Sequence, residues 1–156
     1  MPHTTYGINL SATYKNIDVS VSGYGTMGAK VFNAKRAQRI SNENIELEIA
    51  QDFWTPQNTD AAHPAPISEI PYASTYYLES GDFFRINNIN VAYTFGELNK
   101  FFKGGSFYVN VINPFITQKY SGFSPEISGA PTRGMGVENG VFPTLRSVVT
   151  GVKLNF

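Results

Sequence analysis

The sequence predicts an all-β fold, in which antiparallel transmembrane strands form one segment of a β-barrel. Three observations lead to this expectation. Stretches of alternating apolar and polar residues recur along the chain, aromatic residues make up 14% of it against only 15% charged residues, and it ends on an alternating stretch with a final phenylalanine. An average soluble domain carries roughly 25% charged residues, whereas outer-membrane barrels carry aromatic girdles at both interfaces.

Composition excludes several classes of protein. Twelve Lys and Arg balance twelve Asp and Glu, so there is no strong field to attract nucleic acid. No stretch has the ~18 apolar residues of a transmembrane helix, so any crossing is by strands. The absence of cysteine excludes disulfides and thiolate metal sites. Residues 1–3 do not begin an export signal, so either the barrel interpretation is wrong or the chain lacks its natural N-terminus.

The first two strands, expected at about 4–15 and 17–26, form a hairpin around the Lys15-Asn16 turn. Side chains alternate across a strand, so an apolar row from Tyr6 to Tyr14 faces away from a polar row. At ~3.3 Å per residue and ~40° tilt these residues climb roughly 20 Å, close to the ~25 Å apolar band of a membrane barrel.

Two further strands are expected at about 84–95 and 106–113. The first begins out of phase at residues 83–85, as a bulge would cause. The second is expected to stop before Pro114, because proline cannot donate to a strand ladder.

The last strand is expected at about 146–156, at the very end of the chain. A transmembrane barrel must pair its last strand, because an open strand edge would leave backbone groups unsatisfied in lipid, so this ending points to a barrel. Its row of Val152, Leu154 and Phe156 is expected to act as the signal for barrel assembly. Residues alternate along each strand, so one set is expected to face lipid and the set that alternates with it is expected to face the lumen. The lipid set is Ile8, Leu10, Val91, Val109, Val152 and Leu154, and the lumen set is Asn9, Ser11, Asn90, Asn110, Lys153 and Asn155.

The connections alternate between short and long, as expected for periplasmic turns and extracellular loops. Residues 15–16 and 96–105 are short links, whereas 27–83 and 114–146 are long. A short helix is expected within Ala34–Ala50, with Asn42 as a plausible cap.

Five strands cannot close a barrel, since the smallest bacterial ones have eight, so the chain is expected to be the C-terminal piece of a larger barrel and not to fold alone. The relevant motifs are Tyr6–Leu10, Asp52–Pro56, Leu78–Asn88, Lys119–Glu126 and Gly151–Phe156. In this order they resemble the C-terminal end of SusC/RagA-type TonB-linked outer-membrane transporters, across essentially all 156 residues. Two positions depart from the family: Asp82 stands where serine is common, and Ser124 where aspartate is common.

The resemblance implies a 22-stranded barrel in the outer membrane of a Gram-negative bacterium. In such transporters an N-terminal plug fills the barrel, TonB supplies the energy, and a SusD-type surface lipoprotein covers the outside. The substrates would be glycans or oligopeptides. The family implies no cofactor, and the plug and the TonB-contacting segment are not expected within these 156 residues.

Candidate contact residues lie in the two long connections. Aromatic side chains there can stack on substrate or on a lipoprotein lid, but they serve equally well in loop packing. The candidates for substrate or lipoprotein contact are Trp54, Tyr76, Tyr77, Tyr120, Phe123 and Glu126.

Other polar residues favour no chemistry. His3 and His63 lack neighbours at metal-ligand spacing and are expected to be solvated. Asp52, Asp60 and Glu126 form no pair with acid/base spacing, so no catalytic residue is expected. A basic-to-acidic gradient is expected to be a solvated helix face; its members are Lys35, Arg36, Arg39, Glu43, Glu46, Glu48 and Asp52.

The alternative to a transporter is an extracellular β-rich module, either a lectin-like or an adhesin domain, with its aromatic loops as the binding site. In such a sandwich a second sheet would cover the apolar rows that a barrel turns toward lipid. An enzyme is a more distant third reading.

Overall fold

The computed structural model describes residues 2–42, 44–66, 74–97, 101, 103–127 and 136–156. The described chain divides into two compact units. The sheet unit comprises Pro2–Ala29, Gly81–Lys119 and Pro143–Phe156, and the loop unit comprises Lys30–Ser80 and Tyr120–Phe142.

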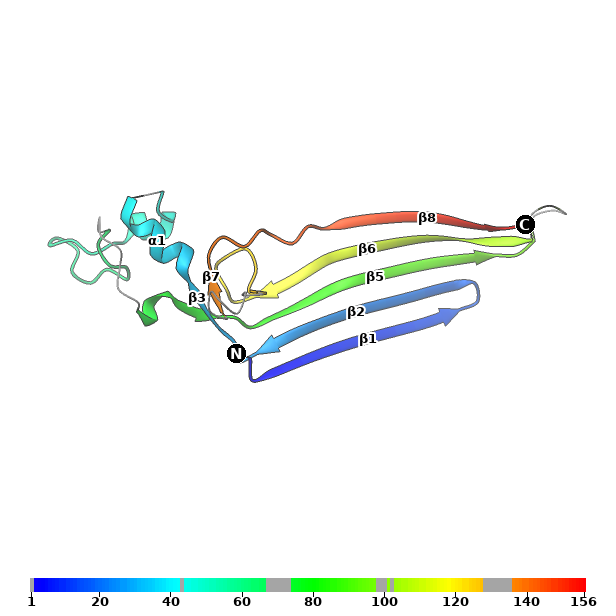
Figure 1. Cartoon of the computed structure of the whole chain (residues 1–156), viewed down its shortest axis with the longest axis horizontal. Coiled ribbons are helices and arrows are strands. Elements are labelled where there is room, and N and C mark those ends of the chain that lie inside the picture. Colours follow the sequence, from blue (N-terminus) through cyan, green and yellow to red (C-terminus); the bar gives the residue numbers. More distant parts are fainter. Residues whose placement is uncertain (1, 43, 67–73, 98–100, 102, 128–135) are drawn as a thin grey trace. The chain divides into compact units, whose positions relative to one another are not determined.

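Five long strands make up the sheet unit, in the order β1-β2-β5-β6-β8, and every neighbouring pair is antiparallel (Figure 1). Their bounds are β1 Thr4–Tyr14, β2 Ile17–Met27, β5 Phe83–Phe95, β6 Gly104–Gln118 and β8 Ser147–Asn155. Each predicted strand is present. Both long connections leave the sheet from the same end, where β2 and β6 finish and β5 and β8 begin.

The register aligns the apolar rows across all five strands, because residues paired between antiparallel strands point to the same side. One such row is Leu10, Val21, Ile89, Val111 and Val148. The adjacent row on the opposite face is Ser11, Ser20, Asn90, Asn110 and Val149. The apolar face is open: Leu10 is 64% exposed and Val152 is 62% exposed. The described residues therefore provide no second sheet over it, as the sandwich alternative would require.

The end of β6 corrects the prediction that this strand stops at Asn113. The strand continues through Pro114 to Gln118, because the pairing with β5 shifts there and leaves one extra residue on β6. Asn113 adopts a positive φ of 53°. Such a β-bulge tolerates proline, since the ladder is already interrupted.

The bulge expected at residues 83–85 is also misplaced. β5 begins at Phe83 and pairs there with β2 in regular register. The shift lies further along, where Ser22 pairs with Asn88 and Gly23 with Ile86, so Asn87 is the extra residue.

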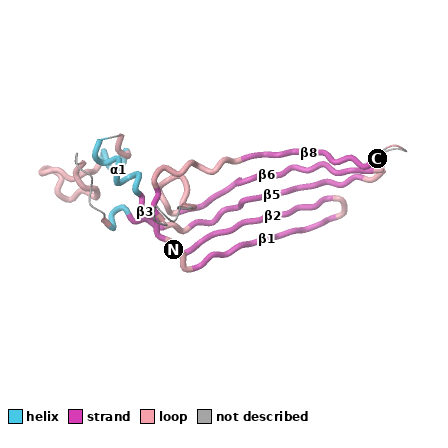
Figure 2. The backbone as a smooth tube through the Cα atoms, in the orientation of Figure 1, coloured by secondary structure: helices cyan, strands magenta, loops and turns pink. Residues whose placement is uncertain are grey.

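The loop unit has a small sheet of its own, in the order β4-β3-β7. The described helical segments of the chain also belong to this unit and are drawn in cyan in Figure 2. Its strands are β3 Lys30–Asn33, β4 Leu78–Ser80 and β7 Val137–Glu138. The single helix predicted within Ala34–Ala50 is two helices, α1 Ala34–Asn42 and α2 Leu47–Gln51, followed by a 3-10 turn, η1 Thr75–Tyr77. Asn42 is the last residue of α1, and the N-cap residue of α2 is Glu46.

The core of the loop unit is small and aromatic. Ile49 and Tyr77 are buried, and Phe32, Ala37, Ile45 and Tyr76 pack against them. The long connections are thus folded segments with a core of their own. No helix among the described residues has both the length and the apolar character needed to cross a membrane.

We expect Gly105→Ala to destabilise the sheet. A Cβ at Gly105 would lie 2.2 Å from the main-chain oxygen of Lys153 on β8, which cannot move away without breaking the strand pairing. Such overpacking costs about 1–3 kcal/mol. The urea midpoint of the full receptor should fall for Gly105→Ala and stay unchanged for Gly96→Ala, because a Cβ at Gly96 would meet nothing within 4 Å. Equal midpoints would contradict the packing seen here.

Candidate functional site

A polar network centred on Asn33 holds the loop unit together. Asn33 is only 3% exposed, at the junction of β3 and α1. Its Oδ1 accepts the main-chain N–H of Arg36 at 2.9 Å, which is the bond of an N-cap residue. Its Nδ2 donates to Glu79 Oε1 at 2.9 Å and to Ser121 Oγ at 3.4 Å. One buried amide therefore joins the start of α1 to the two segments that carry the resemblance motifs.

Glu79 on β4 is the main acceptor of this network. It accepts the main-chain N–H of Ser121 at 2.8 Å and the Ser121 hydroxyl at 2.9 Å. Burial by itself would raise the pKa of Glu79, but the hydrogen bonds from Ser121 and Asn33 and the charge of Arg36 hold it below its usual value. Glu79 is therefore a carboxylate, as its donors require.

Arg36 joins three carboxylates. Its guanidinium forms ion pairs with Glu46 and Glu48 and approaches Glu79 at 3.7 Å. Only 10% of the Arg36 side chain is exposed, so the prediction that the basic-to-acidic gradient is a solvated face is wrong for this residue. It holds for Glu48, which is 59% exposed. Glu43 and the side chain of Arg39 lie outside the described residues.

A second buried pair in the loop unit is Tyr120 and Glu138. The Tyr120 hydroxyl donates to Glu138 Oε2 at 3.2 Å, and these residues are 4% and 2% exposed. Glu138 Oε1 accepts the N–H groups of Gly140 and Val141. Burial and the Glu138 carboxylate raise the pKa of the Tyr120 hydroxyl, so it stays a neutral donor. Tyr120 therefore packs inside the loop unit.

The segment from Asp52 to His63 forms a hydrogen-bonded loop that presents Trp54. The Asp52 carboxylate accepts from the main-chain N–H of Ala62 at 3.1 Å and from the Asn58 side chain at 3.0 Å, and these bonds hold the pKa of Asp52 below its usual value. The main-chain N–H of Trp54 donates to the main-chain oxygen of His63 at 2.9 Å, while 46% of the Trp54 surface stays exposed. This is a braced loop with a half-exposed indole.

His63 corrects the expectation that it is solvated. It is half-buried, and its Nδ1 lies 2.6 Å from the Tyr76 hydroxyl, with the two rings edge to face. Tyr76 also meets Tyr77 edge to face at a centroid distance of 5.0 Å. Tyr77 is 3% exposed, so it belongs to the core. His3 is exposed, as expected.

Phe123 and Glu126 lie on the loop that follows Tyr120. Phe123 is 60% exposed, and the Lys35 ammonium lies 4.4 Å from the centre of its ring. Ser124 is 2% exposed, and its hydroxyl accepts the N–H of Glu126 at 3.2 Å. The Ser124 hydroxyl thus braces the turn that carries Glu126.

The six predicted contact residues therefore divide into two groups. Tyr77 and Tyr120 are buried, and Tyr76 is half-buried in packing and hydrogen bonds. The contact role stays a prediction for all six, and Trp54 and Phe123 are the two with exposed rings. The residues missed from the sequence are Asn33, Glu79 and Glu138, and the signal that could have found Glu79 is its place inside a resemblance motif.

No group of three or more potential metal-ligating residues occurs in the part of the chain that the structure describes. The site is therefore a braced surface that carries aromatic and charged side chains.

Among the proteins similar to this chain are receptors much longer than it. No family model matches. TonB-dependent receptor SusC of Bacteroides thetaiotaomicron is 26% identical over 154 residues, which cover 96% of the chain and 15% of that receptor. TonB-dependent receptor P26 of Formosa agariphila is 25% identical over 177 residues, which cover 100% of the chain and 17% of that receptor. The chain thus spans less than a fifth of the length of these relatives.

Solved structures show the same fold. The RagAB peptide importer matches the whole chain with a TM-score of 0.81 in its closed-closed state and 0.82 in its open-open state. The sequence identity is 22% in both, and the match covers 17% of the solved chain. The five-stranded sheet with its folded connections therefore recurs as part of a larger protein.

Proposed function

This chain is homologous to SusC/RagA-type TonB-dependent receptors, and from that premise we propose that it forms five strands of the barrel wall, with outer loops, of a nutrient importer. The homology implies the outer membrane of a Gram-negative bacterium and a transporter, not an enzyme. The chain supplies wall and loops, and the rest of the receptor supplies the remaining strands and the plug.

The two-faced sheet is the observation that carries this proposal. Every strand contributes to the open apolar face, and the opposite face carries serine and asparagine. A barrel that faces lipid outside and water or a plug inside needs this division. Within the described residues β1 and β8 are the outermost strands, and each needs a further partner in lipid.

Orientation follows from the connections. Long loops of outer-membrane barrels lie outside and short turns lie in the periplasm. The loop unit is built entirely from the two long connections, so we assign it to the cell surface. There it meets substrate and a SusD-type lipoprotein. The name of the similar RagAB peptide importer likewise denotes two components. Energy comes from TonB, and the substrates are glycans or oligopeptides.

Trp54 and Phe123 are the side chains of the loop unit that we assign to substrate or lipoprotein contact. Both are aromatic and exposed, and both stand on braced loops, so little conformational entropy is lost when they are covered. Glu126, anchored by its own N–H to Ser124, is the third contact residue.

We expect the double change Trp54→Ala and Phe123→Ala to reduce uptake or lipoprotein association strongly. Aromatic hot spots are worth on the order of 2 kcal/mol or more each. The measurement is uptake of labelled oligopeptides and glycans, with lipoprotein pull-down, in cells that express the full receptor at matched outer-membrane levels. The control is Phe101→Ala, which removes an aromatic that is 81% exposed in the short link between β5 and β6.

Three outcomes separate the roles. Loss of uptake or pull-down in the double variant, with Phe101→Ala unchanged, supports the assignment. Unchanged uptake and unchanged pull-down would give these loops a purely structural role. Absence of the full receptor from the outer membrane in every variant and in the wild type would contradict the transporter itself.

A further inference from the structure

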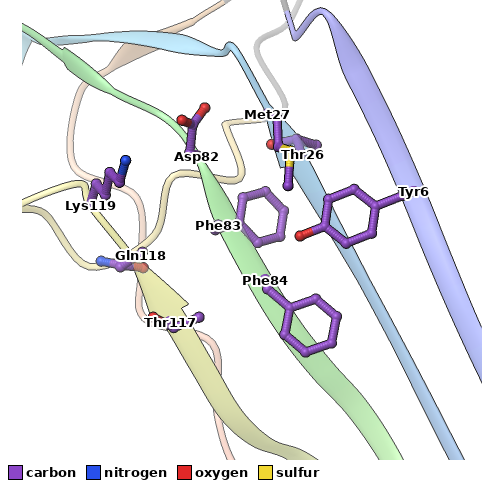
Figure 3. A pocket seen from close by; sticks show the side chains of 9 residues that line it. All are labelled: Tyr6, Thr26, Met27, Asp82, Phe83, Phe84, Thr117, Gln118 and Lys119. Atoms are coloured by element: carbon purple, nitrogen blue, oxygen red, sulfur yellow. The ribbon is translucent and has the colours of Figure 1, made fainter.

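A cavity of about 370 Å³ opens in the sheet unit, at the end from which the long connections leave (Figure 3). Tyr6, Met27 and Phe84 give it apolar walls, and Thr117, Asp82 and Lys119 bring polar groups to it. The cavity is thus amphipathic, with an aromatic side and a polar side that carries one cation and one carboxylate.

Two stacked rings form the aromatic side. Tyr6 on β1 and Phe84 on β5 lie nearly parallel, with a centroid distance of 6.1 Å and an angle of 3° (Figure 3). Gly25 on β2 lies between their strands and pairs with both residues. A Cβ at Gly25 would lie 2.6 Å from the Tyr6 hydroxyl oxygen, so the glycine lets the Tyr6 ring lie across β2.

This aromatic side continues the apolar face of the sheet. The pairing of β1 with β2 has no register shift, so Tyr6 shares its face with Ile8 and Leu10. Under the proposed function that face is the lipid-contacting surface, and the cavity lies where it ends on the outer side. A molecule that reaches the cavity along this face is therefore one of the outer leaflet.

The Lys119 ammonium is the group at the cavity that an acidic head group would meet. Lys119 is exposed. Its main-chain N–H donates to the main-chain oxygen of Asp82 at 3.3 Å, and this bond does not involve the ammonium group. The Asp82 carboxylate accepts the N–H of Ala29 at 3.2 Å. The Lys119 ammonium is thus available to an anion, while the hydroxyl of Thr117 can bond to sugar or phosphate oxygens.

We propose that this cavity, the Tyr6–Phe84 cavity, binds a phosphorylated glycolipid of the outer leaflet. Its acyl chains lie along the apolar face, its sugar covers the paired rings, and its phosphate meets Lys119. The proposal rests on the function proposed above, because it needs this face in the membrane and this end outside.

The test measures glycolipid bound to the full receptor in phosphatidylethanolamine nanodiscs that contain purified diphosphorylated lipid A. Native mass spectrometry counts lipid A molecules retained per receptor. We expect Lys119→Met to lower the affinity about fivefold, the effect of removing one lysine near an anionic lipid surface. Tyr6→Leu, which keeps an apolar side chain but removes the stack, should also lower retention.

The matched control is Lys15→Met. Lys15 is likewise an exposed lysine beside a ring, 5.3 Å from the centre of Tyr14, but it stands in the β1–β2 turn at the opposite end of the sheet. It should leave retention unchanged. Equal retention by wild type and Lys119→Met would overturn the proposal, as would an equal loss in Lys15→Met.

The same samples keep this proposal apart from the function. A folded barrel migrates differently on a gel before and after heating, which reports insertion, and uptake is measured in cells. A receptor that inserts and transports but retains no lipid A would overturn the glycolipid site alone. A receptor that retains lipid A at Lys119 but transports nothing would overturn the importer and leave the site standing.

Discussion

Arginine in place of Leu10 is expected to keep most of the receptor from assembling in the outer membrane. Leu10 lies midway between Tyr6 and Tyr14 on β1, in the apolar row that crosses all five strands, and is 64% exposed. Under the proposed function it contacts the middle of the bilayer, where arginine costs about 2–4 kcal/mol. The measurement is the fraction of full receptor that shows the heat-dependent gel shift of a folded barrel.

Two companion variants test the reason for this effect. Ser11→Arg changes the next residue along the chain, on the opposite face, and should assemble at nearly the wild-type level. Leu154→Arg, close to the end of β8, should be intermediate, because the cost falls toward the interface. If Ser11→Arg were as damaging as Leu10→Arg, the assignment of faces would be wrong.

Replacing Glu79 with alanine is expected to unfold the loop unit while the barrel stays assembled. The change leaves the N–H and hydroxyl of Ser121 and the amide of Asn33 without their acceptor. Hydrogen bonds to a charged group are worth about 1.5–3 kcal/mol each, so the unit should lose about 3 kcal/mol or more. Hydrogen exchange of residues 30–37 and 120–127 in the full receptor measures this loss.

Glu48→Ala is the control, because it removes another carboxylate paired with Arg36. The Glu48 side chain is 59% exposed, and exposed ion pairs contribute about 0–1 kcal/mol. Protection of both segments should therefore stay close to that of the wild type. Equal protection in Glu79→Ala and the wild type would show that the network does not hold the loop unit.

Acid should weaken the same unit. The pKa of Glu79 is lower in the folded state than in the unfolded chain, where it is about 4.3. The stability that its carboxylate contributes is therefore present above about pH 4.3 and is lost as the pH falls through the folded pKa.

The strands of the sheet unit could be predicted because their signal is local. In β1 every second residue from Tyr6 to Tyr14 is apolar or aromatic, and a period of two needs no knowledge of distant partners. The prediction for β6 failed at Pro114 because the bulge that admits a proline depends on the neighbouring strand.

The loop unit could not be predicted in the same way, because its contacts join residues far apart in the chain. Asn33 bonds to Glu79 and Ser121, and nothing in the residues beside Asn33 indicates either partner. The same holds for the aromatic candidates. Tyr120 and Phe123 are three positions apart in one motif, yet one is 4% exposed and the other 60%, since only folding decides which ring meets Glu138.

The spacing of the connections also sets an order for folding. β1 with β2, and β5 with β6, are hairpins whose partners lie close in sequence, so little chain entropy is lost when each forms. Joining β2 to β5 closes residues 28–82, and joining β6 to β8 closes residues 119–146. The first of these loops is about twice as long, which adds only about 0.6 kcal/mol to its closure. We therefore expect the two hairpins to form first and the final strand to join them afterwards.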